Sequence, residues 1–68
     1  MAKYYVNKQA QDNGDHEVHK EGCYWLSLVE SKEYLGDFSS CHGAVRKAKE
    51  KYPTADGCKY CCLECNTG

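Results

Sequence analysis

The 68-residue sequence contains few aliphatic side chains. Four leucines and four valines are spread along the chain, and a chain of this length buries a small share of its surface. A conventional aliphatic core is therefore excluded, and we expect aromatic rings to fill much of the interior, with their hydroxyl groups reaching water. The candidate rings are Tyr4, Tyr5, Tyr24, Trp25, Tyr34, Phe38, Tyr52 and Tyr60.

The chain also lacks an excess of either charge and any long apolar run. Nine basic and ten acidic residues leave a net charge of −1, which indicates no global attraction to nucleic acid or anionic membranes. No apolar run approaches the roughly 20 residues that span a bilayer. The first residues have neither the apolar stretch nor the cleavage site of a secretory signal. We therefore predict a cytoplasmic protein with no membrane association; a mature secreted domain that begins with an added Met is the alternative.

Cysteine, in contrast, is abundant. Four of the six cysteines lie within eight residues as two consecutive C-x2-C pairs, and two intervening residues let both sulfurs of a pair face one Zn²⁺. In the cytoplasm such clusters are more often metal ligands or redox groups than disulfides, whereas the even count of six is compatible with three disulfides. We predict a single domain, residues 1–68, that needs a metal or disulfide staple. The clustered cysteines are Cys58, Cys61, Cys62 and Cys65.

The first third of the chain predicts a β-hairpin. Asn13-Gly14 is the signal of a tight type I′ turn, and the flanking residues predict strand pairing between residues 3–9 and 15–20. The polar residues before the turn allow a loop longer than two residues. Gly22 is expected to break the returning strand.

The middle of the chain predicts a loop over residues 27–33, a short strand over Tyr34–Phe38 and one helix over about residues 41–51. Ser39 or Ser40 is expected to cap the helix, and Pro53 to end it. Its basic residues are interpreted as a solvated face rather than a nucleic-acid surface. We predict an α+β fold in which a small antiparallel hairpin or sheet packs on this helix. The apolar stripe of the helix consists of Ala44, Val45, Ala48 and Tyr52.

Four features follow one another along the chain: His19-x3-Cys23, the strand that ends at Phe38, the two serines before Ala44 and Ala48, and Gly57-Cys58-x2-Cys61. Together they resemble the small zinc-binding module of the Ada type, over about residues 16–61. The whole chain is also similar to a group of small uncharacterised bacterial cysteine-rich proteins with the tail G-C-x-Y-C-C-x-x-C. The Ada-type resemblance implies one zinc ion and gives Cys41, Cys62 and Cys65 no role. The zinc ligands implied by the resemblance are His19, Cys23, Cys58 and Cys61.

Spacing alone leaves alternatives open at this site. Structural zinc takes four ligands, so one ion cannot bind His19, Cys23 and all four clustered cysteines. By spacing, Cys62 and Cys65 could replace Cys58 and Cys61. In an extended strand His19 and Cys23 would lie about 13 Å apart, so joint ligation requires a bend, which Gly22 permits. The alternative for His19 is a solvent-exposed side chain. Cys23 is interpreted as a ligand, a disulfide partner or a buried thiol.

Cys41 is expected in the first turn of the helix, where the helix dipole favours a thiolate. It is interpreted as a disulfide partner or, alternatively, as a reactive thiol. His42 is a poor general base for Cys41, because adjacent residues on a helix do not face each other.

No catalytic set is recognisable in the sequence. We predict that the protein is not an enzyme but a monomeric, metal-binding or disulfide-stapled module that binds an unknown protein or nucleic-acid partner. The alternative is a thiol-active protein, either a redox carrier or a methyl-accepting cysteine protein.

Overall fold

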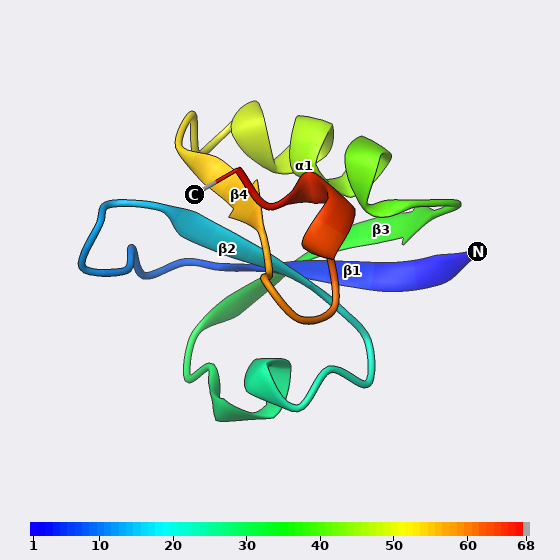
Figure 1. Ribbon diagram of the computed structural model, residues 1–68, viewed down its shortest axis with the longest axis horizontal. Coiled ribbons are helices and arrows are strands. Elements are labelled where there is room, and N and C mark those ends of the chain that lie inside the picture. The colour runs from blue at the N-terminus through cyan, green and yellow to red at the C-terminus, as the bar shows by residue number, and fades with distance from the viewer. Residues whose placement is uncertain (68) are drawn as a thin grey trace.

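A four-stranded sheet carries one α-helix on one side, as the computed structural model shows for residues 1–67 (Figure 1). The predicted α+β fold class is confirmed. The strands are β1 (Ala2–Asn7), β2 (His16–Lys20), β3 (Lys32–Phe38) and β4 (Ala55–Gly57), the helix is α1 (Cys41–Lys49), and two 3-10 turns are η1 (Trp25–Leu28) and η2 (Leu63–Cys65).

The strand order is β3-β1-β2-β4. The expected hairpin is present, since β1 pairs antiparallel with β2, and β1 also pairs antiparallel with β3. β4 was not predicted; it pairs parallel with β2, with Val18 opposite Gly57. The sheet is therefore mixed, and its parallel edge places the start of the C-terminal tail beside the end of β2.

The expected type I′ turn at Asn13-Gly14 is wrong. Among residues 1–67 only glycines have a positive φ, so Asn13 does not adopt the left-handed conformation that this turn requires, whereas Gly14 has φ +90°. The N–H of Gly14 instead donates to the carbonyl of Gln11 at 2.8 Å. The side chain of Asn13 accepts from the N–H of Asp15 at 2.9 Å, as turn asparagines commonly do. The glycine thus occupies the fourth position of a turn within a longer loop.

The core is built mainly from small side chains, and the expected aromatic interior is present only in part. Tyr4 is the one fully buried aromatic ring within the described part of the chain, and the half-buried Phe38 and Tyr52 pack against the core. Trp25 and Tyr60, in contrast, are 41% and 67% exposed. Alanines on α1 let the helix lie close to the sheet, which leaves little volume for further rings. The core consists of Tyr4, Val6, Val18, Ala44, Val45, Ala48 and Ala55 with Cys41, Cys58, Cys62 and Cys65.

Helix α1 follows its prediction with small differences. Ser40 occupies the N-cap position, but its side chain makes no capping hydrogen bond. The helix ends at Lys49, earlier than the expected limit, and its last turn carries basic residues that suit the helix dipole. The loop is shorter than the expected residues 27–33, because η1 ends at Leu28 and β3 begins at Lys32.

The C-terminal tail returns to the fold through covalent and polar contacts. Cys41 at the start of α1 forms a disulfide with Cys65 in η2. The buried carboxylate of Asp56 accepts hydrogen bonds from the backbone N–H of Thr67 at 3.1 Å and from the amide of Asn66 at 3.4 Å. Within residues 1–67, no helix has the length and apolar character needed to cross a membrane.

Candidate metal centre

Strand alternation decides which way His19 points. Successive side chains of a strand point to opposite faces, so Val18 points toward α1 and His19 points to the other face. There the His19 side chain is only 1% exposed. The alternative of a solvent-exposed His19 is therefore wrong.

A bend after β2 brings Cys23 next to His19. Gly22 has φ +92°, a conformation that glycine adopts at little cost, and the N–H of Cys23 donates to the carbonyl of Lys20 at 3.1 Å. The Cys23 Sγ consequently lies 3.7 Å from His19 Nδ1. The bend that joint ligation requires is present.

The parallel pairing of β4 with β2 brings the tail to the same place. Cys58 follows β4 directly, and its N–H donates to the carbonyl of Val18 at 2.9 Å. The chain then turns tightly, with the N–H of Cys62 donating to the carbonyl of Cys58 at 2.9 Å. This turn aims the Cys61 Sγ back at β2, where the N–H of Lys20 donates to it at 3.3 Å.

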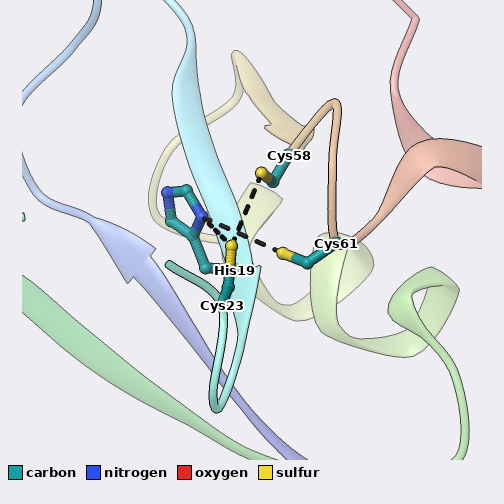
Figure 2. Close-up of side chains that lie close together, drawn as sticks. All are labelled: His19, Cys23, Cys58 and Cys61. Carbon is teal, nitrogen blue, oxygen red and sulfur yellow. Dashed lines mark hydrogen bonds between the residues drawn. The ribbon is translucent and has the colours of Figure 1, made fainter. Parts of the chain in front are cut away.

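One imidazole nitrogen and three sulfurs thus converge from two distant parts of the chain (Figure 2). The four donor atoms lie within 4.8 Å of one another, with Cys23 Sγ 4.0 Å from Cys58 Sγ and Cys61 Sγ 4.0 Å from His19 Nδ1. Sulfur ligands of a tetrahedral zinc ion lie about 3.8 Å apart, as follows from a zinc–sulfur bond of about 2.3 Å. We call His19, Cys23, Cys58 and Cys61 the His19 site; its geometry could hold a metal ion.

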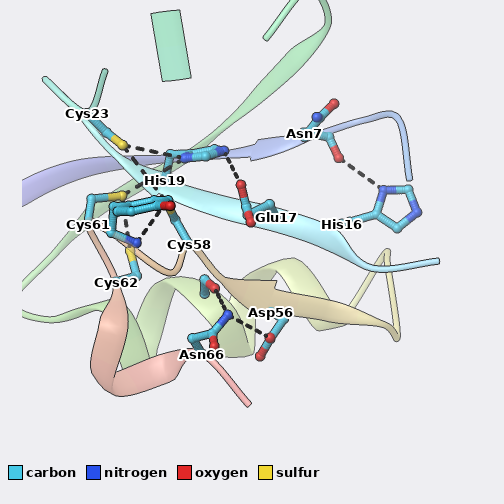
Figure 3. A network of polar contacts seen from close by, with 12 residues as sticks. Asn7, His16, Glu17, His19, Cys23, Asp56, Cys58, Cys61, Cys62 and Asn66 are labelled. Carbon is cyan, nitrogen blue, oxygen red and sulfur yellow. Dashed lines mark hydrogen bonds and ion pairs between the residues drawn. The ribbon is translucent and has the colours of Figure 1, made fainter. Parts of the chain in front are cut away.

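Glu17 completes the surroundings of the imidazole. It lies two residues before His19 on the same face of β2, and its Oε1 lies 3.2 Å from His19 Nε2 (Figure 3). A proton on Nε2 would be donated to this carboxylate, which leaves the Nδ1 lone pair for a metal ion. Burial lowers the pKa of His19, while Glu17 opposes this effect, so the ring is neutral at neutral pH.

The thiols of the His19 site differ in how readily they ionise. Burial strongly raises the pKa of Cys61. Burial also acts to raise the pKa of Cys23, but hydrogen bonds from Cys61 and from the backbone of Leu26 and Trp25 outweigh it, so the pKa of Cys23 is lowered. Cys23 therefore loses its proton more readily than Cys61.

Two of the candidate cysteines lie outside this cluster. Cys62, proposed as an alternate ligand, is 2% exposed and lies with its Sγ 3.8 Å from Cys61 Sγ, beside the site. Cys65, the other alternate, is bonded to Cys41. The disulfide interpretation of Cys41 thus agrees with the structure, in which Cys41 is not a free thiol.

Two features of the site were missed at the sequence level. The first is Glu17, which could have been found from its spacing of two residues from His19 on a strand.

The second is a cluster of exposed rings, Tyr24, Trp25 and Tyr60, which we call the aromatic patch. The ring centroids of Tyr24 and Trp25 are 5.3 Å apart, and Trp25 stacks on Tyr60 at 5.3 Å. Each ring is next to a residue of the His19 site or one position further along the chain.

Comparisons of the chain with protein-family models, with curated proteins and with solved structures find no match. The geometry of the His19 site and its surroundings therefore carries the functional inference.

Proposed function

We propose that this protein is a small zinc-stabilised module without catalytic activity of its own, which binds a protein partner. The observation that carries the proposal is the convergence of the four donor atoms of the His19 site within 4.8 Å. Three thiolates and one imidazole suit Zn²⁺, and four protein ligands fill its coordination shell, which is typical of structural rather than catalytic zinc. We further propose that this site is the counterpart of the Ada-type zinc site.

The aromatic patch supports the binding role. Tyr24 and Trp25 follow Cys23, and Tyr60 stands between Cys58 and Cys61, so a metal ion in the His19 site would fix both segments that carry the rings. Tyrosine and tryptophan are enriched at protein interfaces. A protein is favoured over a nucleic acid as the partner because the chain has a net charge of −1 and offers no global attraction to phosphates.

Zinc binding is tested by native mass spectrometry of the protein before and after chelation. With the disulfide between Cys41 and Cys65 intact, we expect one zinc ion in the wild type, none in Cys23→Ser or Cys61→Ser, and one in the matched control Cys62→Ser. Loss of the ion should unfold the domain, since structural zinc contributes on the order of 10 kcal/mol to small domains. A fully folded protein that binds no zinc would overturn the proposal.

The binding role is tested with peptides selected from a random library on the zinc-loaded protein. Binding of the selected peptides should fall at least tenfold in Trp25→Ala and Tyr60→Ala. It should persist in Tyr34→Ala, which removes an exposed ring outside the aromatic patch. Selection of no peptide, together with tight binding of a single-stranded oligonucleotide, would favour a nucleic-acid partner.

The rival proposal is a thiol-active protein, a redox carrier or a methyl acceptor. A reacting cysteine must be accessible as a thiolate, whereas a metal ligand is protected. Of the four free thiols, only those of Cys23 and Cys61 are partly exposed, and both belong to the His19 site. Timed alkylation of the zinc-loaded protein at pH 7 distinguishes the two proposals: uniform protection supports the binding module, and one cysteine that reacts faster than a free thiol supports the rival.

A further inference from the structure

A second group of metal-ligating side chains gathers where the first turn of α1 meets η2. The donor atoms of Cys41, His42 and Cys65 lie within 4.8 Å of one another. Glu64 lies beside these three, with its Oε1 3.8 Å from Cys41 Sγ and its Oε2 3.9 Å from His42 Nε2. We call Cys41, His42, Glu64 and Cys65 the second donor cluster; it shares no residue with the His19 site.

These donors differ in how deeply they are buried. Cys41 and Cys65 are buried, at 3% and 8% exposure, whereas the side chains of His42 and Glu64 are 62% and 69% exposed. His42 nevertheless folds back, so that its Nδ1 lies 3.6 Å from Cys65 Sγ. The two sulfurs are thus buried, whereas the imidazole and the carboxylate form the exposed rim of the cluster.

In the structure the two sulfurs are joined to each other, and this bond excludes a metal ion. We propose that the second donor cluster is a redox-controlled metal site: the disulfide form binds no ion, and the reduced form binds one zinc ion through Cys41, Cys65, His42 and Glu64. The proposal goes beyond the function proposed above, since it concerns a different site and does not require the His19 site to be loaded.

The reductant is a dithiol. One of its thiolates attacks a sulfur of the pair, the Sγ–Sγ bond breaks, and the reductant leaves as a disulfide after supplying two electrons and two protons. Cys41 and Cys65 become thiols. Binding of Zn²⁺ then releases these two protons to water and leaves two thiolate ligands.

Geometry and charge both suit this exchange. The Cα atoms of Cys41 and Cys65 are 6.3 Å apart, which leaves room for the two sulfurs to separate to about 3.8 Å around one zinc ion. Zn²⁺ with two thiolates and one carboxylate carries a net charge of −1. An anionic complex is stabilised at the N-terminus of a helix such as α1, where the helix dipole is positive.

The ion count by native mass spectrometry tests the proposal. A phosphine serves as reductant, because it becomes its oxide with oxygen from water and leaves no competing thiol. We expect one zinc ion in the disulfide form, held by the His19 site, and two in the reduced form. A reduced protein that binds no more zinc than the disulfide form, with zinc in excess, would overturn the second site, whereas a disulfide form without zinc would contradict only the proposed function.

Variants at the rim test which side chains hold the second ion. In the reduced protein, His42→Ala and Glu64→Gln should weaken binding of the second zinc at least tenfold and leave the first unchanged. Both residues are exposed, so these variants are expected to fold. Glu50→Gln, an exposed carboxylate beyond the other end of α1, is the matched control and should change neither. A second ion that is retained equally in all three variants would overturn the assignment.

Discussion

Glu17 and His19 act as a pair because a strand repeats every two residues. The pairing of β2 with β1 turns both side chains away from α1, and the carboxylate then meets the imidazole at 3.2 Å. A carboxylate that orients a histidine ligand fixes its tautomer and raises its basicity. At the residue scale, we therefore expect metal binding at the His19 site to depend on Glu17, a side chain outside the proposed ligand set.

We predict that Glu17→Gln weakens zinc binding about tenfold or more, which is the effect typical of losing a carboxylate behind a histidine ligand. The dissociation constant, measured by competition with a chromophoric chelator, checks the prediction. Glu21→Gln removes an exposed carboxylate from the following turn and serves as control. Equal affinity of Glu17→Gln and the wild type would show that the carboxylate does not support the ligand.

Gly57 is a second residue whose importance lies in its surroundings. A Cβ at this position would lie 2.7 Å from the carbonyl oxygen of Cys62 and 2.7 Å from the Cβ of Cys65. We predict that Gly57→Ala lowers the free energy of unfolding by about 1–3 kcal/mol, because backbone on both sides must shift. Chemical denaturation measures the loss, with the exposed Lys59→Ala as control. An unchanged unfolding midpoint for Gly57→Ala would mean that η2 can move away freely.

At the scale of elements, β2 is the strand on which the rest of the protein converges. It pairs with β1 on one side and β4 on the other, it turns one face to α1, and it supplies His19 from its other face. β4 has three residues, yet its parallel pairing positions Cys58 and with it the whole cysteine-rich tail. Packing and the His19 site therefore share one element.

We predict that Val18→Ala destabilises the protein by about 2 kcal/mol, through the loss of two buried methyl groups and the cavity they leave. Val18 is completely buried between the sheet and α1. Val29→Ala removes the same atoms from a half-buried loop position outside the core and should cost clearly less. Thermal unfolding of both variants checks the prediction, and equal melting temperatures would contradict it.

At the scale of the whole molecule, two connections hold the tail to a core that contains few large side chains, and the proposed metal ion would add a third. The disulfide joins α1 to η2 and Asp56 binds the end of the tail, while an ion in the His19 site would join the turn after β2 to the segment after β4. A chain of this size gains little from its core alone. Stability is therefore expected to follow the state of these connections.

We predict that the zinc-loaded protein loses stability on acidification below about pH 6.5. Protons compete with zinc for the thiolates and the imidazole. Burial lowers the pKa of His19 in the folded state, so on acidification the His19 imidazole is protonated first in the unfolded chain, at about pH 6.5. The contribution of the neutral imidazole to the free energy of unfolding is therefore complete above that pH. It is lost as the pH falls toward the lowered pKa of the folded state.

Circular dichroism during acid titration, with the zinc content measured in parallel, checks this prediction. The exposed His42→Asn, with the disulfide intact, is the control and should unfold at the same pH as the wild type. Retention of zinc and fold down to pH 4 would contradict the prediction.

The sequence by itself determined the elements with local signals. The hairpin between residues 2 and 20 and helix α1 follow from residue periodicity and turn residues, and Gly22 marks the bend that lets His19 and Cys23 meet. The resemblance to the Ada-type module named the four residues that the structure brings together. That the chain forms one domain stays a prediction.

Only the tertiary structure decided what depends on contacts between distant residues. The parallel pairing of β4 with β2 chose Cys58 and Cys61, rather than Cys62 and Cys65, to lie beside His19, since spacing alone fits either pair. Long-range packing also bonds Cys65 to Cys41. It leaves four of the eight aromatic rings exposed, because the small contact residues of α1 leave little room for them inside. Local patterns carry no information on such pairings, which are set by how the whole chain packs.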